Sequence, residues 1–382
     1  MGKLTELKKL KQAYLQVMFP QERETVPRLR FSGFTEPWEQ RKLNDVADNV
    51  GTGRSTFSSG VSELPETPFA VLGSTSVIGY DSEFDHDGDF ILTARVGANA
   101  GNLYRHTGKV KISDNTVYIQ GNNLDFLFCL LEKFDLKSLS FGTGQPLIKA
   151  SELKSLALHY PCEEEQSLIG NFFRTLDNTI AIYKQKLDEL KQLKKAYMQV
   201  MFPQEGETVP RLRFAGFAEP WQRDKANKIF LPVSSKGFPE LPILSATQSQ
   251  GMVLRDEIGI DMKFNKENAI GYKRVLPGQF VIHLRSFQGG FAHSNIAGIT
   301  SPAYTILDFA DSSSQISLFW LEVLRSEKFI KSLELVTYGI RDGKSISFND
   351  FSMLELAFPS KEEQTTIGNF FRTLDELIKL YS

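Results

Sequence analysis

The chain has 382 residues, of which 41% are hydrophobic and 24% charged, so it can form two or three packed domains and is not a disordered or low-complexity protein. Its 44 Lys and Arg against 46 Asp and Glu give a formal net charge of −2, which neither requires nor excludes a nucleic-acid partner, because binding faces are local. The sequence has two cysteines without a CxxC pair, no apolar run of about 20 residues and no secretory signal, which predicts a soluble protein of the reducing cytoplasm.

The first segment, 1–21, carries half of a helical pattern. Leu7, Leu10, Tyr14 and Met18 recur at intervals of three and four residues and predict one apolar helix face. Residues 22–160 follow as short strands broken by Gly, Ser, Asn and Pro, which is typical of a mixed α/β domain.

The central segment, 161–204, predicts one long helix. Its apolar residues advance by three and four positions in a heptad pattern, at Phe173, Leu176, Ile180, Tyr183, Leu187 and Leu190. No proline interrupts 162–202, and Pro203 ends the pattern. About 39 residues at ~1.5 Å each would span roughly 58 Å. This stripe predicts an antiparallel coiled coil with another helix.

Residues 205–358 predict a second mixed α/β domain, and 359–382 predict half of a second helix. Ile367, Phe371, Leu374, Ile378 and Tyr381 give this last segment the first half of the central stripe. The expected fold class is therefore α+β, with two α/β domains separated by a pair of long antiparallel helices. Phe172 and Phe370 lie off the narrow apolar stripe and are candidates for a surface that faces a partner subunit.

Two blocks of the sequence occur twice. Leu4–Trp38 matches Leu187–Trp221 at an offset of 183, with 28 of 35 positions identical. Glu164–Asp177 matches Glu362–Asp375 at an offset of 198, with 12 of 14 identical. These repeats indicate a pseudo-two-fold internal organisation in which near-identical helices carry two divergent domains.

The two offsets share one seam. Met1 carried forward by 183 and Ser382 carried back by 198 both give position 184. The chain is therefore interpreted as a two-unit ring opened inside one repeated helix. We expect that helix to be assembled from the N- and C-terminal segments, within one chain or between chains.

Catalytic motifs are absent from the sequence. Gly343-Lys344-Ser345 resembles the end of a phosphate loop, but the required first glycine falls on Tyr338. The acidic run Asp81–Asp89 lacks the glycine and the distant glutamate of a calcium loop and is interpreted as a solvated turn. No metal-ligand spacing, nucleophile elbow or methyltransferase motif is present. We therefore expect no catalytic residue, metal or cofactor on this chain.

Polar and basic residues gather around a faint correspondence between the two domains at offset 190. Gly88-Asp89-Phe90-Ile91 matches Gly278-Gln279-Phe280-Val281, and Arg95 matches Arg285. Arg can bind guanine bidentately, and Asn or Gln can bind adenine in the same way. Each of these residues could instead be a surface salt-bridge former or part of a turn. The candidates for DNA contact are Arg54, Arg95, Asn99, Asn102, Arg105, Lys109, Lys111 and Asn115 in the first domain, and Gln248, Gln250, Lys273, Arg274, Arg285, Ser286, Gln288 and His293 in the second.

The blocks VPRLRFxGFxEPW and EEQxxIGNFFRTLD, repeated around two divergent domains, resemble the specificity subunit of type I restriction-modification systems. The resemblance covers essentially the whole chain. The second domain is similar to one variant of that family through GQFVIHLRSFQGG and Ser301-Pro302-Ala303-Tyr304, and the first to another through GDFILTARVGANAGN and Ser113-Asp114-Asn115-Thr116. The half-helix before the first domain departs from the more familiar arrangement of the family.

The resemblance implies that each domain is a target-recognition domain for one half of an asymmetric, bipartite site in double-stranded DNA. The long helices would set the spacer and dock two modification subunits, which bring S-adenosylmethionine for N6-adenine methylation. Two restriction subunits would add translocation and cleavage that use ATP and Mg. This chain would itself have no catalytic activity and bind no cofactor.

Two other functions stay open at this point. A duplicated, non-catalytic scaffold that binds protein partners fits the flat net charge and the acidic run at 81–89. A stand-alone methyltransferase or nuclease is disfavoured by the missing motifs. Affinity for duplex DNA that falls steeply with salt separates the first of these from a DNA-binding subunit.

Overall fold

The computed structural model describes residues 2–56, 61–139, 147–204, 206–248, 250–258, 269–335 and 346–382. The phosphate-loop-like segment Gly343-Lys344-Ser345 lies outside these residues. The chain divides into two compact units, one made of Met1–Gln185 with Ser382 and the other of Lys186–Tyr381. The five-segment division expected from the sequence is finer than this, and its boundaries stay a prediction.

The longest element is the helix α5 (Glu163–Val200, 38 residues), which begins in the first unit and ends in the second. Three glutamates, Glu163, Glu164 and Glu165, form its first turn, where negative charge is favoured by the helix dipole. Pro203 follows its end, as expected for a residue that cannot continue a helix. The prediction of one uninterrupted helix is confirmed.

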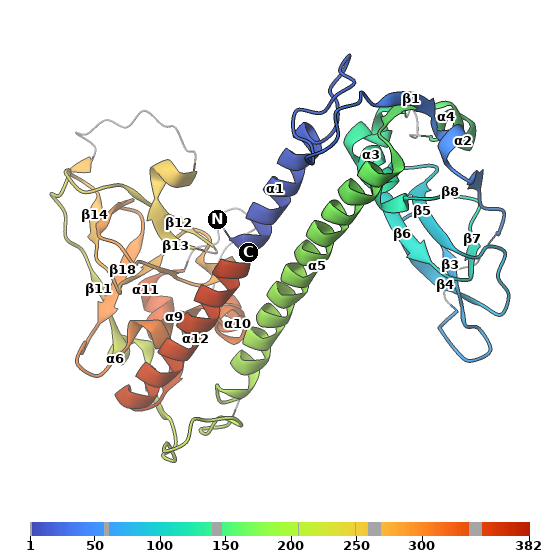
Figure 1. Ribbon diagram of the computed structural model, residues 1–382. Coiled ribbons are helices and arrows are strands. Elements are labelled where there is room, and N and C mark those ends of the chain that lie inside the picture. Colours follow the sequence, from blue (N-terminus) through green and yellow to red (C-terminus); the bar gives the residue numbers. More distant parts are fainter. Residues whose placement is uncertain are drawn as a thin grey trace. The chain divides into compact units, whose positions relative to one another are not determined.

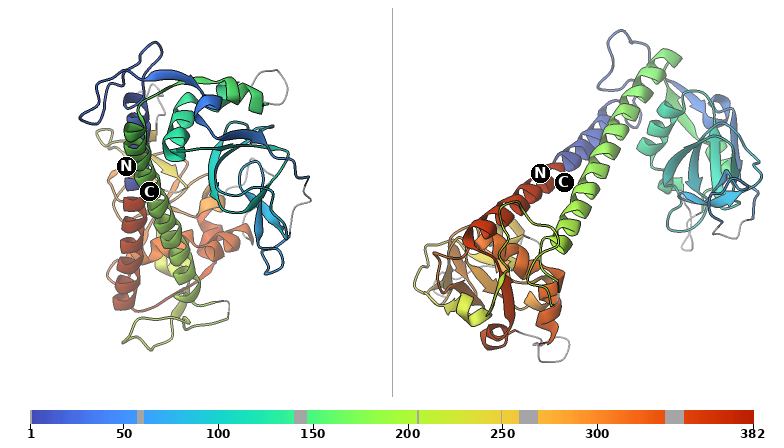
Figure 2. Two further views of the ribbon diagram at one scale, coloured as in Figure 1. Left: turned by 45° about the vertical axis from the view of Figure 1, so that its right-hand side comes forward. Right: turned by 90° about the horizontal axis from the view of Figure 1, so that it is seen from below.

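In the first unit the helix α1 (Lys3–Val17) packs antiparallel on the first part of α5 (Figures 1 and 2). The ring of Tyr14 meets that of Phe172 edge-on at 5.0 Å between centroids. Further along, the ammonium group of Lys3 lies 6.0 Å from the centroid of the Tyr183 ring. Because residue numbers fall along α1 as they rise along α5, the two helices run in opposite directions.

The second unit repeats this arrangement with the helix α12 (Lys361–Tyr381) on the last part of α5. Tyr197 and Phe370 form the matching edge-on ring pair at 5.0 Å. The ammonium group of Lys186 lies 5.8 Å from the centroid of the Tyr381 ring. Both units therefore contain an antiparallel helix pair, one with its partner helix from the N-terminal segment and the other from the C-terminal segment.

The two terminal segments meet through the last residue of the chain. The backbone amide of Thr5 donates to the Ser382 carbonyl oxygen at 3.0 Å, and the Thr5 hydroxyl donates to the same oxygen at 2.9 Å. The equivalent positions of the repeat are Asp188 and Lys184, four residues apart inside α5. The seam predicted at position 184 is thus bridged by a bond with the spacing of an ordinary α-helical hydrogen bond.

One part of the predicted apolar stripe is wrong. The pattern predicts Leu10 on the apolar face of the first segment, but the residue is 44% exposed. Its repeat partner Leu193 is 42% exposed. Lys11, the next residue along, is buried instead. The lysine can occupy the inner position because two carboxylates neutralise its charge there.

The domain of the first unit is built on a four-stranded sheet in the order β2-β8-β5-β6, with a second, three-stranded sheet β4-β3-β7 beside it. The short pair β1-β9 joins the start of the domain to its end through the register Glu39↔Tyr160. The elements are β1 (Glu39–Lys42), α2 (Leu43–Val46), β2 (Asn49–Thr52), β3 (Phe69–Leu72), β4 (Val77–Asp81), β5 (Asp89–Ala94), β6 (Leu103–Thr107), β7 (Val110–Ile112), β8 (Thr116–Gln120), α3 (Leu124–Phe134), the 3-10 turn η1 (Leu136–Leu139), α4 (Ala150–Ser155) and β9 (Ala157–Tyr160).

The domain of the second unit contains a four-stranded sheet in the corresponding order β11-β18-β15-β16, with the hairpin β12-β13 and the pair β14-β17. The pair β10-β19 joins its two ends through the register Gln222↔Phe358. The elements are β10 (Gln222–Lys225), α6 (Ala226–Ile229), β11 (Phe230–Val233), β12 (Leu244–Thr247), β13 (Gly251–Leu254), η2 (Arg255–Ile258), β14 (Lys273–Val275), β15 (Phe280–Ile282), α8 (Ser286–Gly289), β16 (Ala292–His293), β17 (Gly298–Thr300), β18 (Thr305–Phe309), α9 (Ser317–Arg325), α10 (Glu327–Leu335), α11 (Phe348–Ser352) and β19 (Glu355–Phe358).

The sequence correspondence at offset 190 has a structural cause. Gly88 and Gly278 precede β5 and β15, and both have positive φ, +118° and +89°. Glycine adopts this conformation without the steric penalty of a side chain, so it suits the turn that leads into each of these central strands. The predicted α+β fold, with two mixed domains on a repeated antiparallel helix pair, is confirmed.

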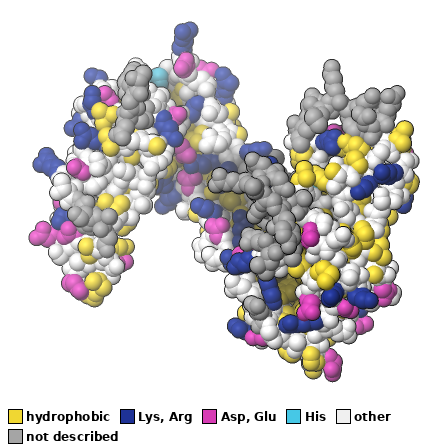
Figure 3. Space-filling model, turned by 180° about the vertical axis from the view of Figure 1, so that it is seen from behind, with side chains coloured by type: hydrophobic (Ala, Val, Ile, Leu, Met, Phe, Trp, Pro, Cys, Tyr) yellow, Lys and Arg dark blue, Asp and Glu magenta, His cyan; other side chains and the backbone are white. Residues whose placement is uncertain are grey.

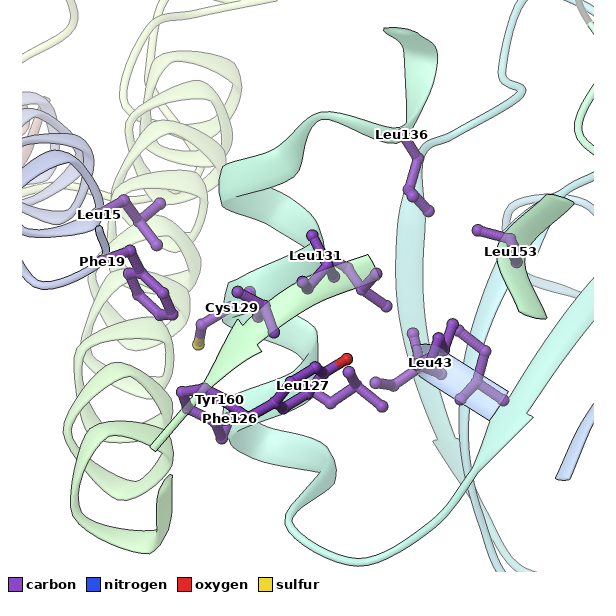
Figure 4. Close-up of a cluster of buried hydrophobic side chains, with 14 of the residues drawn as sticks. Leu15, Phe19, Leu43, Phe126, Leu127, Cys129, Leu131, Leu136, Leu153 and Tyr160 are labelled. Carbon is purple, nitrogen blue, oxygen red and sulfur yellow. The ribbon is translucent and has the colours of Figure 1, made fainter. Parts of the chain in front are cut away.

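Each domain is fixed to its helix pair by one aromatic cluster. In the first unit Phe19 stacks on Phe126 of α3 at 5.9 Å, and Trp38 meets Phe126 edge-on at 5.8 Å. Figure 4 shows Leu15 and Phe19 beside α5 and the buried side chains of α3 between them and the rest of the domain. In the second unit Phe202 and Trp221 hold Phe319 of α9 in the same way, at 5.8 and 5.6 Å.

In each unit a glycine of the repeated helix allows the domain helix to approach closely at this aromatic cluster. A Cβ atom on Gly170 would lie 2.7 Å from the backbone nitrogen of Phe126, and one on Gly368 in α12 would lie 2.9 Å from that of Phe319. Both distances are too short for a real Cβ contact, and backbone cannot move aside as a side-chain tip can. Glycine at this place in IGNFF therefore permits close helix–helix approach.

We predict that Gly170→Ala lowers the free energy of unfolding of the first unit by about 1 to 3 kcal/mol, the usual cost of overpacking. An exposed helical glycine would show the opposite sign, because alanine favours the helix by about 1 kcal/mol. Chemical denaturation of the full chain measures the change. Asn178→Ala, at an exposed position of α5, is the control and should be neutral; equal stability of Gly170→Ala would contradict the close approach.

Candidate nucleic-acid interface

Several of the first domain's candidate residues gather at one end of the four-stranded sheet, where β2 and β5 end and β8 begins. The backbone amide of Arg95 donates to the Asn115 carbonyl at 2.8 Å and so ties the loop after β5 to the loop before β8. Gly53, after β2, is tied to the start of β8 by a 2.9 Å bond to Thr116. We call the group Arg54, Arg95, Asn99, Asn102 and Asn115 the first loop end.

The side chains of the first loop end are available to a ligand. Arg54, Asn99, Asn102 and Asn115 are exposed, and Arg95 is half-buried. The Asn102 amide donates to the Asn99 side-chain oxygen at 3.3 Å, which leaves hydrogen-bonding groups of both residues facing solvent. This end of the sheet combines two arginines with three asparagines, the residue types that contact guanine and adenine edges.

The remaining candidates of the first domain have partners inside the protein. Arg105, on β6, pairs with Asp125 of α3 at 3.0 Å, and its guanidinium lies 4.0 Å from the Phe128 ring centroid. Lys111 pairs with Asp81 at 3.0 Å, and Lys109 lies over the Phe84 ring at 4.8 Å. Lys109 follows the far end of β6, so the structure does not bring it to the first loop end, and Lys111 lies on β7 with its ammonium group held by Asp81.

The acidic run at 81–89 is a structural turn. Asp81 forms the ion pair with Lys111. Asp85 accepts hydrogen bonds from the Ser55 hydroxyl at 2.9 Å and from the Ile112 amide at 3.1 Å. The Lys111 hydrogen bond is the main reason why the pKa of Asp81 lies below its usual value. Among the described residues, no group of three or more His, Cys, Asp or Glu side chains could hold a metal ion.

The second domain gathers candidates at the corresponding end of its sheet. The Gln248 amide, after β12, donates to the Gln288 side-chain oxygen in α8 at 2.9 Å, although the two residues are 40 positions apart. Gln250 and Arg285 are exposed beside them along the chain. We call Gln248, Gln250, Arg285 and Gln288 the second loop end. Arg285 follows β15 as Arg95 follows β5.

The Gln248–Gln288 pair is preorganised for hydrogen bonding. Their mutual bond uses one donor of Gln248 and one acceptor lone pair of Gln288. This bond does not use the side-chain oxygen of Gln248 or the side-chain NH₂ of Gln288, and both residues are exposed. An amide oxygen and an amide NH₂ are the groups that bind the N6 amino group and the N7 atom of adenine in the major groove.

Two candidates of the second domain lie in the protein interior. Ser286 is fully buried, and its hydroxyl accepts the backbone amide of His283 at 2.8 Å. His293 is 3% exposed, and its ring packs against Phe280 at 5.0 Å. Neither side chain reaches the surface in this structure, so we leave both out of the proposed contact set.

Lys273 and Arg274 lie on β14 and support neighbouring loops. The Lys273 ammonium donates to the Tyr304 carbonyl at 2.7 Å, and burial together with Lys236 lowers its pKa. The Arg274 guanidinium lies 4.3 Å from the Phe238 ring centroid. Both positions precede β15, and these contacts engage their charged groups.

The surface charge is local in character. On the face shown in Figure 3, Lys and Arg side chains are scattered among acidic and hydrophobic ones and do not form one continuous basic area. Recognition by such a surface would depend on the particular residues at each loop end more than on a broad positive field.

Phe172 and Phe370, the candidates for a partner-facing surface, are partly buried against their own chain. Phe172 contacts Tyr14 at 5.0 Å and Phe31 at 6.3 Å. Phe370 contacts Tyr197 and Phe214 at 5.0 and 5.6 Å. These contacts attach the VPRLRF segment to the helix pair.

Besides Leu10 and Leu193, exposed apolar residues of the repeat lie in the segments after α1 and α5. Val26 and Leu29 are 43% and 45% exposed, and their repeat partners Val209 and Leu212 are 44% and 45% exposed. Sequence analysis missed this set because loop residues follow no periodic pattern. The occurrence of the same residues in both repeats is the sequence signal that could identify this set.

Sequence analysis also missed two buried ion pairs. Arg30 holds the fully buried Glu165 with bonds of 2.7 and 2.8 Å, and Arg213 holds Glu363 with two bonds of 2.7 Å. The hydrogen bond to the carboxylate is the main reason why the pKa of each arginine lies above its usual value. Both pairs join the VPRLRF segment to the first turn of EEQxxIGNFF, so they explain why these charged residues are identical in the two repeats.

The described residues contain no helix that is both long enough and apolar enough to cross a membrane. Residues 35–192 match the family model of the type I restriction modification DNA specificity domain. The matched segment is thus similar to this DNA specificity domain, and curated relatives that match the chain are named type I restriction enzyme specificity subunits. The resemblance noted from the repeated blocks is confirmed.

Individual members of the specificity-subunit family show how far this similarity extends. The Type I restriction enzyme EcoprrI specificity subunit of Escherichia coli is 30% identical over 118 residues, which is 29% of this chain and 29% of that protein. The MjaVIII specificity subunit of Methanocaldococcus jannaschii is 25% identical over 319 residues, 76% of this chain and 73% of that protein. The chain thus aligns with less than a third of the first of these relatives and most of the second.

A crystal structure of a type I restriction-modification S subunit from M. genitalium shares the fold. Its TM-score is 0.62 with 13% sequence identity, covering 92% of this chain and 93% of that one. At this identity the similarity shows a common architecture, and it does not transfer individual contact residues.

We predict that Arg30→Met lowers the unfolding free energy of the first unit by about 3 to 5 kcal/mol, because Glu165 would remain buried without a counter-charge. The matched control is Arg28→Ala, which removes the exposed Arg28–Glu24 pair and should cost less than about 1 kcal/mol. Denaturant titration measures both variants. Similar losses for the two would contradict a structural role for burial of the Arg30–Glu165 pair.

Burial of His293 predicts a pH dependence of stability. Desolvation, aided by Arg325, lowers the pKa of this histidine to about 4, whereas the unfolded chain has about 6.5. Unfolded protein therefore binds the extra proton first, and stability falls as the pH drops below about 6.5. From pH 7.5 to pH 5 the loss due to this group is about 2 kcal/mol. Denaturation of the wild type and of His293→Gln at both pH values isolates it; the same pH dependence in both proteins would refute the assignment.

Proposed function

We propose that the chain is the non-catalytic subunit that gives a type I restriction-modification complex its DNA sequence specificity. Each domain reads one half of a bipartite, asymmetric site in double-stranded DNA through its loop end, mainly in the major groove. The observation that carries this proposal is that one sheet order, with arginine after the matching strand, recurs in two divergent domains on near-identical helix pairs.

The two loop ends differ where readers of different half-sites should differ. The first offers Arg54, Arg95 and asparagines, and the second offers Arg285 and the Gln248–Gln288 pair. Arginine suits guanine and both amide side chains suit adenine. Different arrangements of these groups favour two unlike half-sites, and the repeated helices set the spacer between them.

The same helices and the segments beside them dock two modification subunits, one on each repeat. Support comes from the exposed apolar pairs Val26 with Leu29 and Val209 with Leu212, which are identical in the two repeats and equally exposed. In this proposal S-adenosylmethionine binds the modification subunits, and ATP and Mg bind two restriction subunits. The chain itself binds none of them and acts in the cytoplasm.

The proposal is tested by an N6-methyladenine map of the genome in cells with and without this gene. Loss of one gapped motif on deletion supports the specificity role and gives both half-sites. An unchanged map, with the modification subunit expressed, would contradict it. Binding of purified protein to duplex DNA should also fall steeply with salt, whereas a scaffold for protein partners should show no such binding.

We predict that Gln248→Ala and Gln288→Ala each weaken discrimination at the same base pair of one half-site by about 1 to 3 kcal/mol. Both residues belong to one hydrogen-bonded pair, so the double variant should lose little more than either single one. Gln222→Ala, an exposed glutamine on β10, is the control. Competition binding with duplexes altered at single positions measures the effect; loss at two different base pairs would disprove joint reading.

A further inference from the structure

In each unit one lysine of the repeated helices lies between two carboxylates; Lys11 is buried and Lys194 is partly buried. Lys11 on α1 is 2.6 Å from Asp177 and 2.7 Å from Glu132. Lys194, its repeat partner on α5, is 2.7 Å from Asp375 and 3.0 Å from Glu322. The Lys11 side chain is 10% exposed, so its charge depends on these partners for compensation.

The three members of each group come from different parts of the chain. The lysine and the aspartate belong to the repeated helices, which are nearly identical in the two units. The third member, Glu132 or Glu322, belongs to the first long helix of a divergent domain, α3 or α9. Each group thus joins the constant helix pair to a variable domain.

The two glutamates are not equivalent positions. Gly170 lies against Phe126 as Gly368 lies against Phe319. The rings of Phe19 and Phe126 stack with an interplanar angle of 26°, and those of Phe202 and Phe319 with one of 23°. These contacts align α3 with α9 at an offset of 193. Under that alignment Glu322 corresponds to Cys129, and Glu132 corresponds to Arg325.

The two domains therefore place a carboxylate beside the equivalent lysine of their unit from helix positions that differ by three residues. Residues three apart lie on one face of a helix, so either can reach the same point. Both positions are covered to some extent: Cys129 is fully buried, and the partly buried Arg325 lies near Glu322 and Asp375. The helix sequences have otherwise diverged, yet the acidic contact to the lysine is present in both.

We propose that Lys11 with Asp177, and Lys194 with Asp375, form a charged socket that positions whichever recognition domain occupies that place. The domain supplies one carboxylate, from either of two positions on its first long helix. Glu132 and Glu322 are then positioning residues for DNA reading, and a domain exchanged onto this helix pair needs an acid at one of these positions. The consequence for DNA reading rests on the proposed function.

The physical basis is the directionality of a buried ion pair. The aromatic contacts nearby, such as Phe19 with Phe126, hold the domain helix against the helix pair mainly by burying apolar surface, which depends less on exact geometry than an ion pair does. A lysine whose charge is buried between two carboxylates accepts few geometries, because each displaced partner leaves an uncompensated charge. The socket thus fixes the orientation of α3 or α9, and with it the loop end of the same domain.

The test moves the carboxylate instead of only removing it. In the full chain, Glu132→Arg breaks the socket, and Cys129→Glu combined with Glu132→Arg rebuilds it in the arrangement found in the second domain. The mirror set in the second domain is Arg325→Glu combined with Glu322→Cys, compared with Glu322→Cys alone. Glu164→Gln, an exposed acid on α5, is the control.

Two readouts separate the socket from the proposed function. Hydrogen exchange of the α3 and α9 amides reports docking of each domain without DNA, and competition with duplexes scrambled in one half-site reports reading. We expect Glu132→Arg to reduce α3 protection and first half-site discrimination by about tenfold or more, with the second half-site unchanged. The transposed variant should recover both to within about threefold of wild type.

The socket would be refuted if Glu132→Arg kept wild-type α3 protection, or if neither transposed variant recovered protection in its own domain. If one transposed variant does not fold, recovery in the other decides the question. Loss and recovery of protection without sequence-selective DNA binding by the parent chain would support the socket and contradict the proposed function instead.

Discussion

The arrangement of each unit depends on one close contact, in which the first long helix of the domain lies against a glycine of a repeated helix. Gly170 meets the backbone of Phe126, and Gly368 meets that of Phe319. Because no Cβ intervenes, the phenylalanine ring contacts the rings of Phe19 and Trp38, or of their repeat partners, at nearly the same distances in both units. All but one of the side chains in this contact belong to the repeated blocks.

This division explains how near-identical helices carry domains that differ in sequence. A domain must supply a phenylalanine that packs against the glycine of the helix pair and, by our proposal, an acid that pairs with its lysine. The rest of the domain is free to change as long as the sheet order is kept. The loops at the end of the sheet are then the place where the two domains differ in chemistry, with asparagines in one and a glutamine pair in the other.

Much of this arrangement could be predicted from the sequence, and the failures share one cause. The repeats disclosed the helices, the split helix and the two domains, because identity over long blocks needs no knowledge of packing. The periodic pattern is wrong for Leu10 and Lys11, because it assigns leucine to the buried face from hydrophobicity alone. It carries no information that Asp177 and Glu132 lie beside Lys11. Short, irregular strands give no reliable inward face, so the sequence does not show that Ser286 and His293 are buried. The Gln248–Gln288 bond joins segments that only the folded chain brings together.

The central claim is that the constant helix pairs carry interchangeable recognition domains. It is tested most directly in a chain that carries the same domain twice. The segment from β1 to β9 (39–160) is replaced by a second copy of the segment from β10 to β19 (222–358), and the resulting N6-methyladenine motif is mapped in cells that express the modification subunit. The account predicts a site that contains the second domain's half-site twice, in place of two unlike halves. A motif that keeps the first half-site would contradict it.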